Sequence, residues 1–119
     1  MEIIFKKCNT CGNVLWEFGD RNLACCSKDM RTLKANEVDA SFEKHIPNYK
    51  VIDNKIVIEV NHVMEDNHYI MWIMMVCDNE IYYKEFIPGE RPIVTFDYKE
   101  NATIYSYCNL HGLWSKEVE

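Results

Sequence analysis

The feature that most constrains this chain is a cluster of cysteines near its start. Four of its six cysteines fall within the first 26 residues, as the pair Cys8 and Cys11 and the adjacent pair Cys25 and Cys26. The surrounding segment holds few large apolar residues, and a segment of this length usually needs a cross-link to fold. We therefore expect a small hairpin module that is stapled by a metal ion.

The spacing of these cysteines leaves the nature of the cross-link open. Four thiolates suit a tetrahedral zinc or iron ion. Neighbouring side chains on a strand point to opposite faces, so Cys25 and Cys26 must lie at a bend to reach one ion. Three interpretations fit this spacing: a structural zinc knuckle, a disulfide or unreactive thiols, and an iron ion that cycles by one electron. The first residues lack the features of a secretory signal, so we expect a cytoplasmic protein in which metal binding is favoured over disulfides.

Charge and hydropathy exclude two classes of partner. The net charge is −6, from 13 Lys and Arg against 19 Asp and Glu. Nucleic acids and anionic membrane surfaces bind basic patches, so neither is an expected partner. No apolar run approaches the ~20 residues that span a bilayer. The content of 48% hydrophobic and 27% charged residues is ordinary for a globular protein.

The rest of the chain has the pattern of short strands that are separated by turns. A polar connector over residues 35–44 precedes it, and no long stretch has helical periodicity. Strands are expected at residues 14–18, 55–60, 69–76, 80–87, 92–98 and 102–107. This spacing is typical of an antiparallel sandwich or barrel. We expect an all-β protein, with the module in residues 1–35 and the sandwich in residues 36–119.

All four histidines follow residue 44, and each lies in or beside an expected loop. They are His45, His62, His68 and His111, with Cys108 three residues before the last. A single histidine of this kind is more often an ordinary core or surface residue than a ligand. Together, however, four imidazoles and one thiolate suit iron, zinc, copper or nickel. Five ligands on a six-coordinate ion would leave one position open for a small molecule.

Several motifs occur in an order that resembles the desulfoferrodoxin family of superoxide reductases: KCNTCGNV, CCSKDM, EKHIP, HVMEDNHYIMWI and YCNLHGLW. The resemblance covers nearly the whole chain. It implies a desulforedoxin-like Fe(Cys)4 module, in which zinc could replace iron, followed by an immunoglobulin-like β-sandwich with an Fe(His)4Cys site. Two positions depart from the family pattern. Ser27 follows the paired cysteines where the family often has glycine, and Val63 follows a histidine where the family commonly has proline.

The resemblance also implies roles for individual residues. The first iron would be bound by Cys8, Cys11, Cys25 and Cys26, and the second by His45, His62, His68, Cys108 and His111. The second iron would reduce superoxide to hydrogen peroxide by one electron, with no release of O2. Lys44 would attract the anionic substrate, and Glu43 would bind the oxidised iron once peroxide has left. A rubredoxin-like electron donor, a homodimer and a part in defence against oxidative stress are further implications.

Two other functions stay open from the sequence. The chain could be a non-catalytic electron carrier of the same fold, or a structural protein loaded with zinc. Glu65 and Asp66 are interpreted as turn residues, Cys77 as a core thiol, and Trp114 as a packing residue that shields the site.

Overall fold

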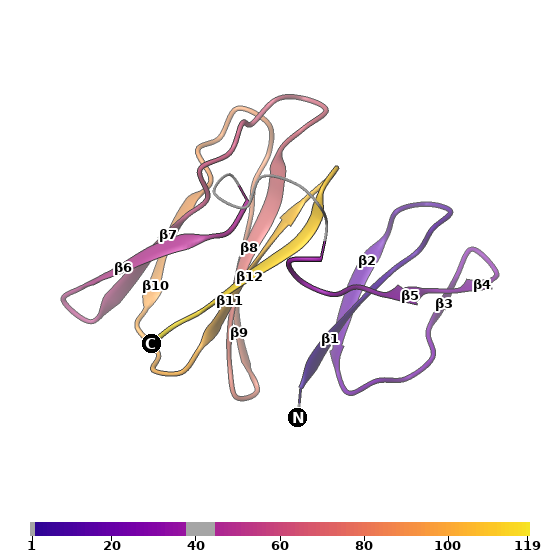
Figure 1. The fold of residues 1–119 in the computed structure, drawn as a ribbon, viewed down its shortest axis with the longest axis horizontal. Helices are drawn as coiled ribbons and strands as arrows, with labels where there is room; N and C mark the ends of the chain where they lie inside the picture. The colour runs from indigo at the N-terminus through magenta and orange to yellow at the C-terminus, as the bar shows by residue number, and fades with distance from the viewer. Residues whose placement is uncertain (1, 38–44) are drawn as a thin grey trace. The chain divides into compact units, whose positions relative to one another are not determined.

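The regular secondary structure of the described residues consists of short antiparallel strands. The structure is a computed structural model, which describes residues 2–37 and 45–119. It divides into two compact units, Met1–Lys34 and Ala35–Glu119 (Figure 1). Within the described ranges no helix has the length and apolar character needed to cross a membrane.

The first unit consists of a three-stranded sheet in the order β2-β1-β5 and a separate hairpin, β3-β4. Phe5 on β1 lies opposite Trp16 on β2, and their rings pack 6.3 Å apart. Such a small apolar contact is consistent with a module that needs a cross-link. The strands are β1 (Ile3–Lys7), β2 (Val14–Phe18), β3 (Ala24–Cys25), β4 (Lys28–Asp29) and β5 (Arg31–Thr32).

The second unit is a sandwich of two antiparallel sheets with strand orders β10-β7-β6 and β12-β11-β8-β9. Its strands are β6 (Asn48–Ile52), β7 (Lys55–Glu59), β8 (Ile70–Cys77), β9 (Glu80–Glu85), β10 (Ile93–Asp97), β11 (Thr103–Cys108) and β12 (Gly112–Glu117). This architecture confirms the predicted immunoglobulin-like fold class.

The core of the sandwich lies between these two sheets. Alternate residues of β7, Ile56 and Ile58, are fully buried and pack in one cluster with Ile73 and Met75 of β8 and Ile104 of β11. This alternation follows from the period of a strand, in which every second side chain faces the same side. The cluster also includes Cys108, so one end of the core borders the candidate metal site.

Strand β8 is buried on both faces, which explains why its sequence is almost continuously apolar. Trp72 and Met74 occupy the face opposite to Ile73 and are also buried. The Trp72 ring stacks on Tyr107 at 5.7 Å, so aromatic side chains cover this outer face. Met74 and Met75 are therefore completely buried on opposite sides of the strand, where the flexible methionine side chain fills the available space.

The strands predicted from the sequence are present, with small differences at their ends. The strands that the pattern missed are β1, β6 and β12, together with the two-residue strands of the first unit. The segment of β12 begins with Gly112, a residue type that is common in turns, so the sequence pattern did not indicate a strand there. It forms six cross-strand pairs with β11, because Leu113 and Trp114 are buried there.

Candidate metal centres

The first cysteine pair forms a tight turn that brings backbone N–H groups to sulfur. Cys8 is buried just after β1, and the amide of Cys11 donates to its Sγ at 3.4 Å. The amide of Gly12 donates to the carbonyl of Cys8 at 2.9 Å, and Gly12 has a φ of +81°. The amide of Cys11 stabilises the thiolate and lowers the pKa of Cys8 to about 6.

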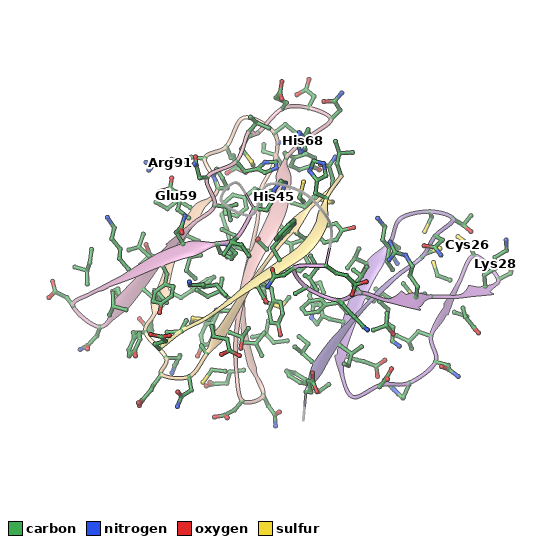
Figure 2. All side chains as sticks on the ribbon, in the orientation of Figure 1. Cys26, Lys28, His45, Glu59, His68 and Arg91 are labelled. Atoms are coloured by element: carbon green, nitrogen blue, oxygen red, sulfur yellow. The ribbon has the colours of Figure 1, made fainter. Side chains whose placement is uncertain are left out.

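The second cysteine pair lies at the tip of the hairpin β3-β4. Cys25 pairs with Lys28, and Cys26 lies in the turn next to Lys28 (Figure 2). The two residues between the paired ones, Cys26 and Ser27, have φ values of 54° and 64°. A two-residue loop with positive φ at both positions is a type I′ turn. The predicted bend at the cysteine pair is thus confirmed, and it is the hairpin turn itself that presents Cys26.

The four sulfur atoms are spaced as ligands of one tetrahedral ion would be. The Sγ atom of Cys25 lies 3.6 Å from that of Cys11 and 4.0 Å from that of Cys26. A tetrahedron with metal–sulfur bonds of ~2.3 Å has edges of ~3.8 Å. Hydrogen bonds within the cluster, chiefly to Cys11, raise the pKa of Cys25 and raise that of Cys26 to about 12. Four thiolates therefore need a cation to be stable together, and the donor set fits zinc or iron.

The four histidines, all of them outside the strands, meet at one end of the sandwich. Their rings form a closed cycle in which each ring meets the next edge to face. The centroid distances are 4.8 Å for His45–His62, 4.6 Å for His62–His68, 5.0 Å for His68–His111 and 4.8 Å for His111–His45. A cycle of four imidazoles leaves a space at its centre where one ion can be bound.

The ring nitrogens that face this space are identified by their neighbours. Nε2 of His45 lies 3.0 Å from Nδ1 of His111, which matches the ~3.0 Å between adjacent nitrogens at metal–nitrogen distances of ~2.1 Å. Nδ1 of His62 contacts the carbonyl of Val63, which leaves Nε2 for a metal. Nε2 of His68 is buried and has no hydrogen-bond partner among the described residues. A buried nitrogen without a partner is costly unless it binds an ion.

Cys108 supplies the fifth donor from the end of β11. The pairing of β11 with β8 shifts between Tyr107 and Cys108, so that Cys108 pairs with Ile70 and Met71 is left as an extra residue. A bulge of this kind redirects a side chain at a strand end. The Sγ atom of Cys108 lies 3.5 Å from Nε2 of His62 and 3.8 Å from Nδ1 of His111.

The Cys108–His111 loop repeats the turn of the first cysteine pair. The amide of His111 donates to Sγ of Cys108 at 3.4 Å, and Gly112 follows with a φ of +81°. Both values equal those of the Cys8–Cys11 turn. The chain therefore uses the same short turn twice, once to place two sulfurs and once to place a sulfur and an imidazole.

The electrostatics of the second cluster favour metal ligation. Burial lowers the pKa of both His62 and His111, and the neighbouring histidines lower it further. Their imidazoles are therefore neutral near pH 7, as a ligand must be. Burial raises the pKa of Cys108, while the amides of His111 and Leu110 act in the opposite direction. A cation in the cluster would reverse this shift and hold the thiolate form.

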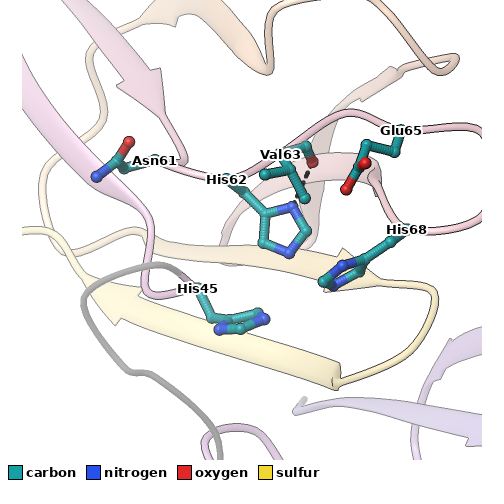
Figure 3. Close-up of a pocket in the computed structure, with 6 residues that line it drawn as sticks. All are labelled: His45, Asn61, His62, Val63, Glu65 and His68. Atoms are coloured by element: carbon teal, nitrogen blue, oxygen red, sulfur yellow. Dashed lines mark hydrogen bonds between the residues drawn. The ribbon is translucent and has the colours of Figure 1, made fainter.

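An open pocket of about 430 Å³ gives access to the histidine cluster. It is lined by three of the imidazoles, as Figure 3 shows, and by Asn61, Val63 and Glu65. Glu65 was interpreted from the sequence as a turn residue only. It does lie in a turn, whose amide and carbonyl groups pair Glu65 with His68. That short turn is the signal that could have placed its side chain beside the pocket.

The nine predicted ligands are brought together as two groups, Cys8, Cys11, Cys25 and Cys26, and His45, His62, His68, Cys108 and His111. Glu43 and Lys44 lie outside the described residues.

Comparison with known proteins places the chain in a family. The family model for desulfoferrodoxin matches residues 37–117. The chain belongs to the desulfoferrodoxin family. The desulfoferrodoxin of Syntrophotalea carbinolica is 38% identical over 117 residues, which cover 93% of each chain. That of Desulfarculus baarsii is 37% identical with the same coverage.

A solved structure extends this similarity to the whole desulfoferrodoxin chain. The superoxide reductase from Treponema pallidum matches with a TM-score of 0.77 and 30% sequence identity, over 98% of this chain and 99% of the other. The family predicted from the motifs is therefore confirmed. The two departures from the family pattern leave both groups of donors in place, although Ser27 has the positive φ that favours glycine.

Proposed function

We propose that this desulfoferrodoxin is a superoxide reductase whose reaction takes place at the histidine cluster. The observation that carries the proposal is the combination of five converging donors with a pocket that reaches three of the four imidazoles. A group of ligands that was only structural would be closed on all sides. The superoxide reductase from Treponema pallidum, similar over nearly the whole chain, supports the same activity.

The proposed reaction consumes one superoxide, one electron and two protons and yields one hydrogen peroxide. Ferrous iron, bound by His45, His62, His68, Cys108 and His111, would supply the electron and would be restored by an external donor. Superoxide is a small anion, so its capture depends on local potential rather than on the net charge of −6. Lys44, next to His45 in the chain, would provide that positive potential.

The residues around the proposed centre have separate tasks. The buried thiolate of Cys108 would donate negative charge to the iron, which favours electron transfer to the substrate, as thiolate ligation does in haem enzymes. The contact of His62 Nδ1 with the carbonyl of Val63 fixes the orientation of one imidazole. Glu43 would provide a carboxylate oxygen to oxidised iron, which prefers hard donors.

We propose a structural task for the first unit, with an accessory part in electron transfer. Residues 1–35 would be a desulforedoxin-like module and residues 36–119 the catalytic domain. The four cysteines of the first unit would bind iron or zinc. Four thiolates leave no position on a tetrahedral ion for superoxide. We further propose a homodimer, a rubredoxin-like electron donor and a cytoplasmic location, in keeping with a part in superoxide detoxification.

The decisive experiment measures iron content and oxidation together. The reduced protein is exposed to a flux of superoxide, and the visible spectrum and peroxide yield are recorded for wild type and Cys108→Ser. We expect two metal ions per chain in the wild type, rapid oxidation, and a slower reaction in the variant. A coloured wild-type protein that superoxide does not oxidise would indicate an electron carrier. A colourless protein loaded with zinc would indicate a structural role.

A further inference from the structure

Two neighbouring strands carry a buried pair of residues behind the histidine cluster. Ser106 on β11 lies directly opposite Trp114 on β12. Both side chains are completely buried, with exposed fractions of 0%. A buried hydroxyl and a buried indole N–H each need a hydrogen-bond partner, and such partners fix the groups to which they are bonded.

The first group that this pair contacts is His45. The hydroxyl of Ser106 donates to the carbonyl oxygen of His45 at 3.2 Å. The indole of Trp114 stacks on the imidazole of His45, with the ring centroids 4.8 Å apart and the planes 23° apart. His45 belongs to no strand, so the sheet ladders do not determine its position. One contact fixes its backbone and the other limits the rotation of its ring.

The second group is the loop that carries His111. The Nε1–H of Trp114 donates to the carbonyl oxygen of His111 at 3.2 Å. The same indole therefore contacts two histidines that are 66 positions apart in the chain and whose ring nitrogens lie 3.0 Å from each other. A change in the Trp114 ring would alter the relative orientation of both imidazoles.

We propose that Ser106 and Trp114 are positioning residues that hold His45 and His111 in the geometry required for metal binding. The inference rests on the metal site of the proposed function, but it concerns the rigidity of that site rather than the reaction. Partners behind metal ligands orient them, and their loss typically weakens metal binding by about 10–100-fold. Trp114 also covers one face of His45, so it adds to the burial of that ligand (4% exposed).

The test compares three variants of the full chain after loading with iron. Trp114→Phe keeps an aromatic ring but removes the N–H donor, Trp114→Leu removes both, and Ser106→Ala removes the hydroxyl. Two properties are measured: the rate at which Fe²⁺ passes to an added chelator, and the energy of the sulfur-to-iron absorption band of the oxidised form. The control is Trp72→Phe, because Trp72 is also buried and stacks on Tyr107, and its side chain lies on the face of β8 opposite to that of the core residue Ile73.

We expect release from the histidine site to be about tenfold faster in Trp114→Phe and Ser106→Ala, and faster still in Trp114→Leu. The absorption band should shift more in Trp114→Leu than in Trp114→Phe, while Trp72→Phe should match the wild type in both. Wild-type rates and spectra in both Trp114→Phe and Ser106→Ala would overturn the proposal. An equally large increase in the rate of Fe²⁺ release from Trp72→Phe would also overturn the proposal, because it would indicate general loosening of the sheet.

If Trp114→Leu does not fold, Trp114→Phe and Ser106→Ala still test whether the two residues position the histidines. No measurement here uses superoxide, so failure of the wild type to react with it would refute the proposed activity alone.

Discussion

The Sγ atom of Cys108 lies 3.5 Å from Nε2 of His62, although 46 positions separate the two residues in the chain. Cys108 is completely buried at the end of the core, whereas His62 borders the open pocket. The sulfur atom therefore approaches the cluster from inside the protein, whereas solvent reaches the cluster from the pocket that the imidazoles line.

Replacement of His68 by alanine should remove the metal from the histidine cluster alone. Nε2 of His68 is buried without a partner among the described residues, so its role is best explained as a ligand. The metal content should fall from about two ions per chain to about one, because the cysteine cluster keeps its own ligands. Elemental analysis checks this result. Cys77→Ser is the control and should keep both ions, since Cys77 belongs to neither group of metal donors and its thiol donates to the carbonyl of Glu100.

Replacement of Ser27 by glycine should stabilise the first unit. Ser27 has a φ of 64°, a conformation that costs most residues about 1–2 kcal/mol and costs glycine little. We expect the free energy of unfolding to rise by about 1 kcal/mol, because the relief of backbone strain exceeds the entropic cost of the more flexible glycine in the unfolded chain. Urea unfolding followed through the absorbance of the cysteine site measures it. Ser115→Gly, in the interior of β12, should have the opposite effect on the second unit, and a less stable Ser27→Gly would contradict the argument.

Replacement of Lys44 by alanine should slow the capture of superoxide. The loss of the positive charge that is next to His45 in the chain should lower the second-order rate constant by about tenfold at low salt and flatten its dependence on ionic strength. Pulse radiolysis at several salt concentrations measures both quantities. Lys50→Ala removes an exposed lysine from β6 and should change neither. An unchanged rate in Lys44→Ala would exclude a role in capture.

Replacement of Glu43 by alanine should alter the oxidised protein but not the reduced one. A carboxylate that binds only Fe³⁺ affects the absorption spectrum of the oxidised form, because hard cations favour oxygen ligands. The visible spectrum of the oxidised variant should therefore differ from that of the wild type, with a smaller dependence on pH. Identical spectra at every pH would show that Glu43 is not a ligand, and Glu37→Ala provides a control of the same charge change.

Much of the fold could be predicted because its strands carry their own signals. The apolar run of β8 and the turn residues Asp53 and Asn54, which have φ values of 50° and 63°, each indicate local structure. Strand β12 was missed because its first residues resemble a turn. Its identity depends on burial against β11, and burial of that kind is a property of the tertiary structure.

The candidate site was predictable as a list of residue types but not as an arrangement. Cysteines at the spacing of Cys8 and Cys11, and the pair Cys108 and His111, form chelating turns whose geometry is local. The structure confirms Glu65 as a turn residue, but its place beside the pocket depends on segments that are distant in the sequence. The same reason explains why the contacts of Ser106 with His45 could not be foreseen.

By itself, the sequence determined that this chain would form strands, that two short turns would present sulfur donors, and that it belongs to the desulfoferrodoxin family. Only the tertiary structure decided that four imidazoles form a closed cycle around one space and that Cys108 meets them from the core. The physical reason is that turns and strands depend on neighbouring residues, whereas the meeting of His45, His62 and His111 depends on how two sheets pack and where their loops end.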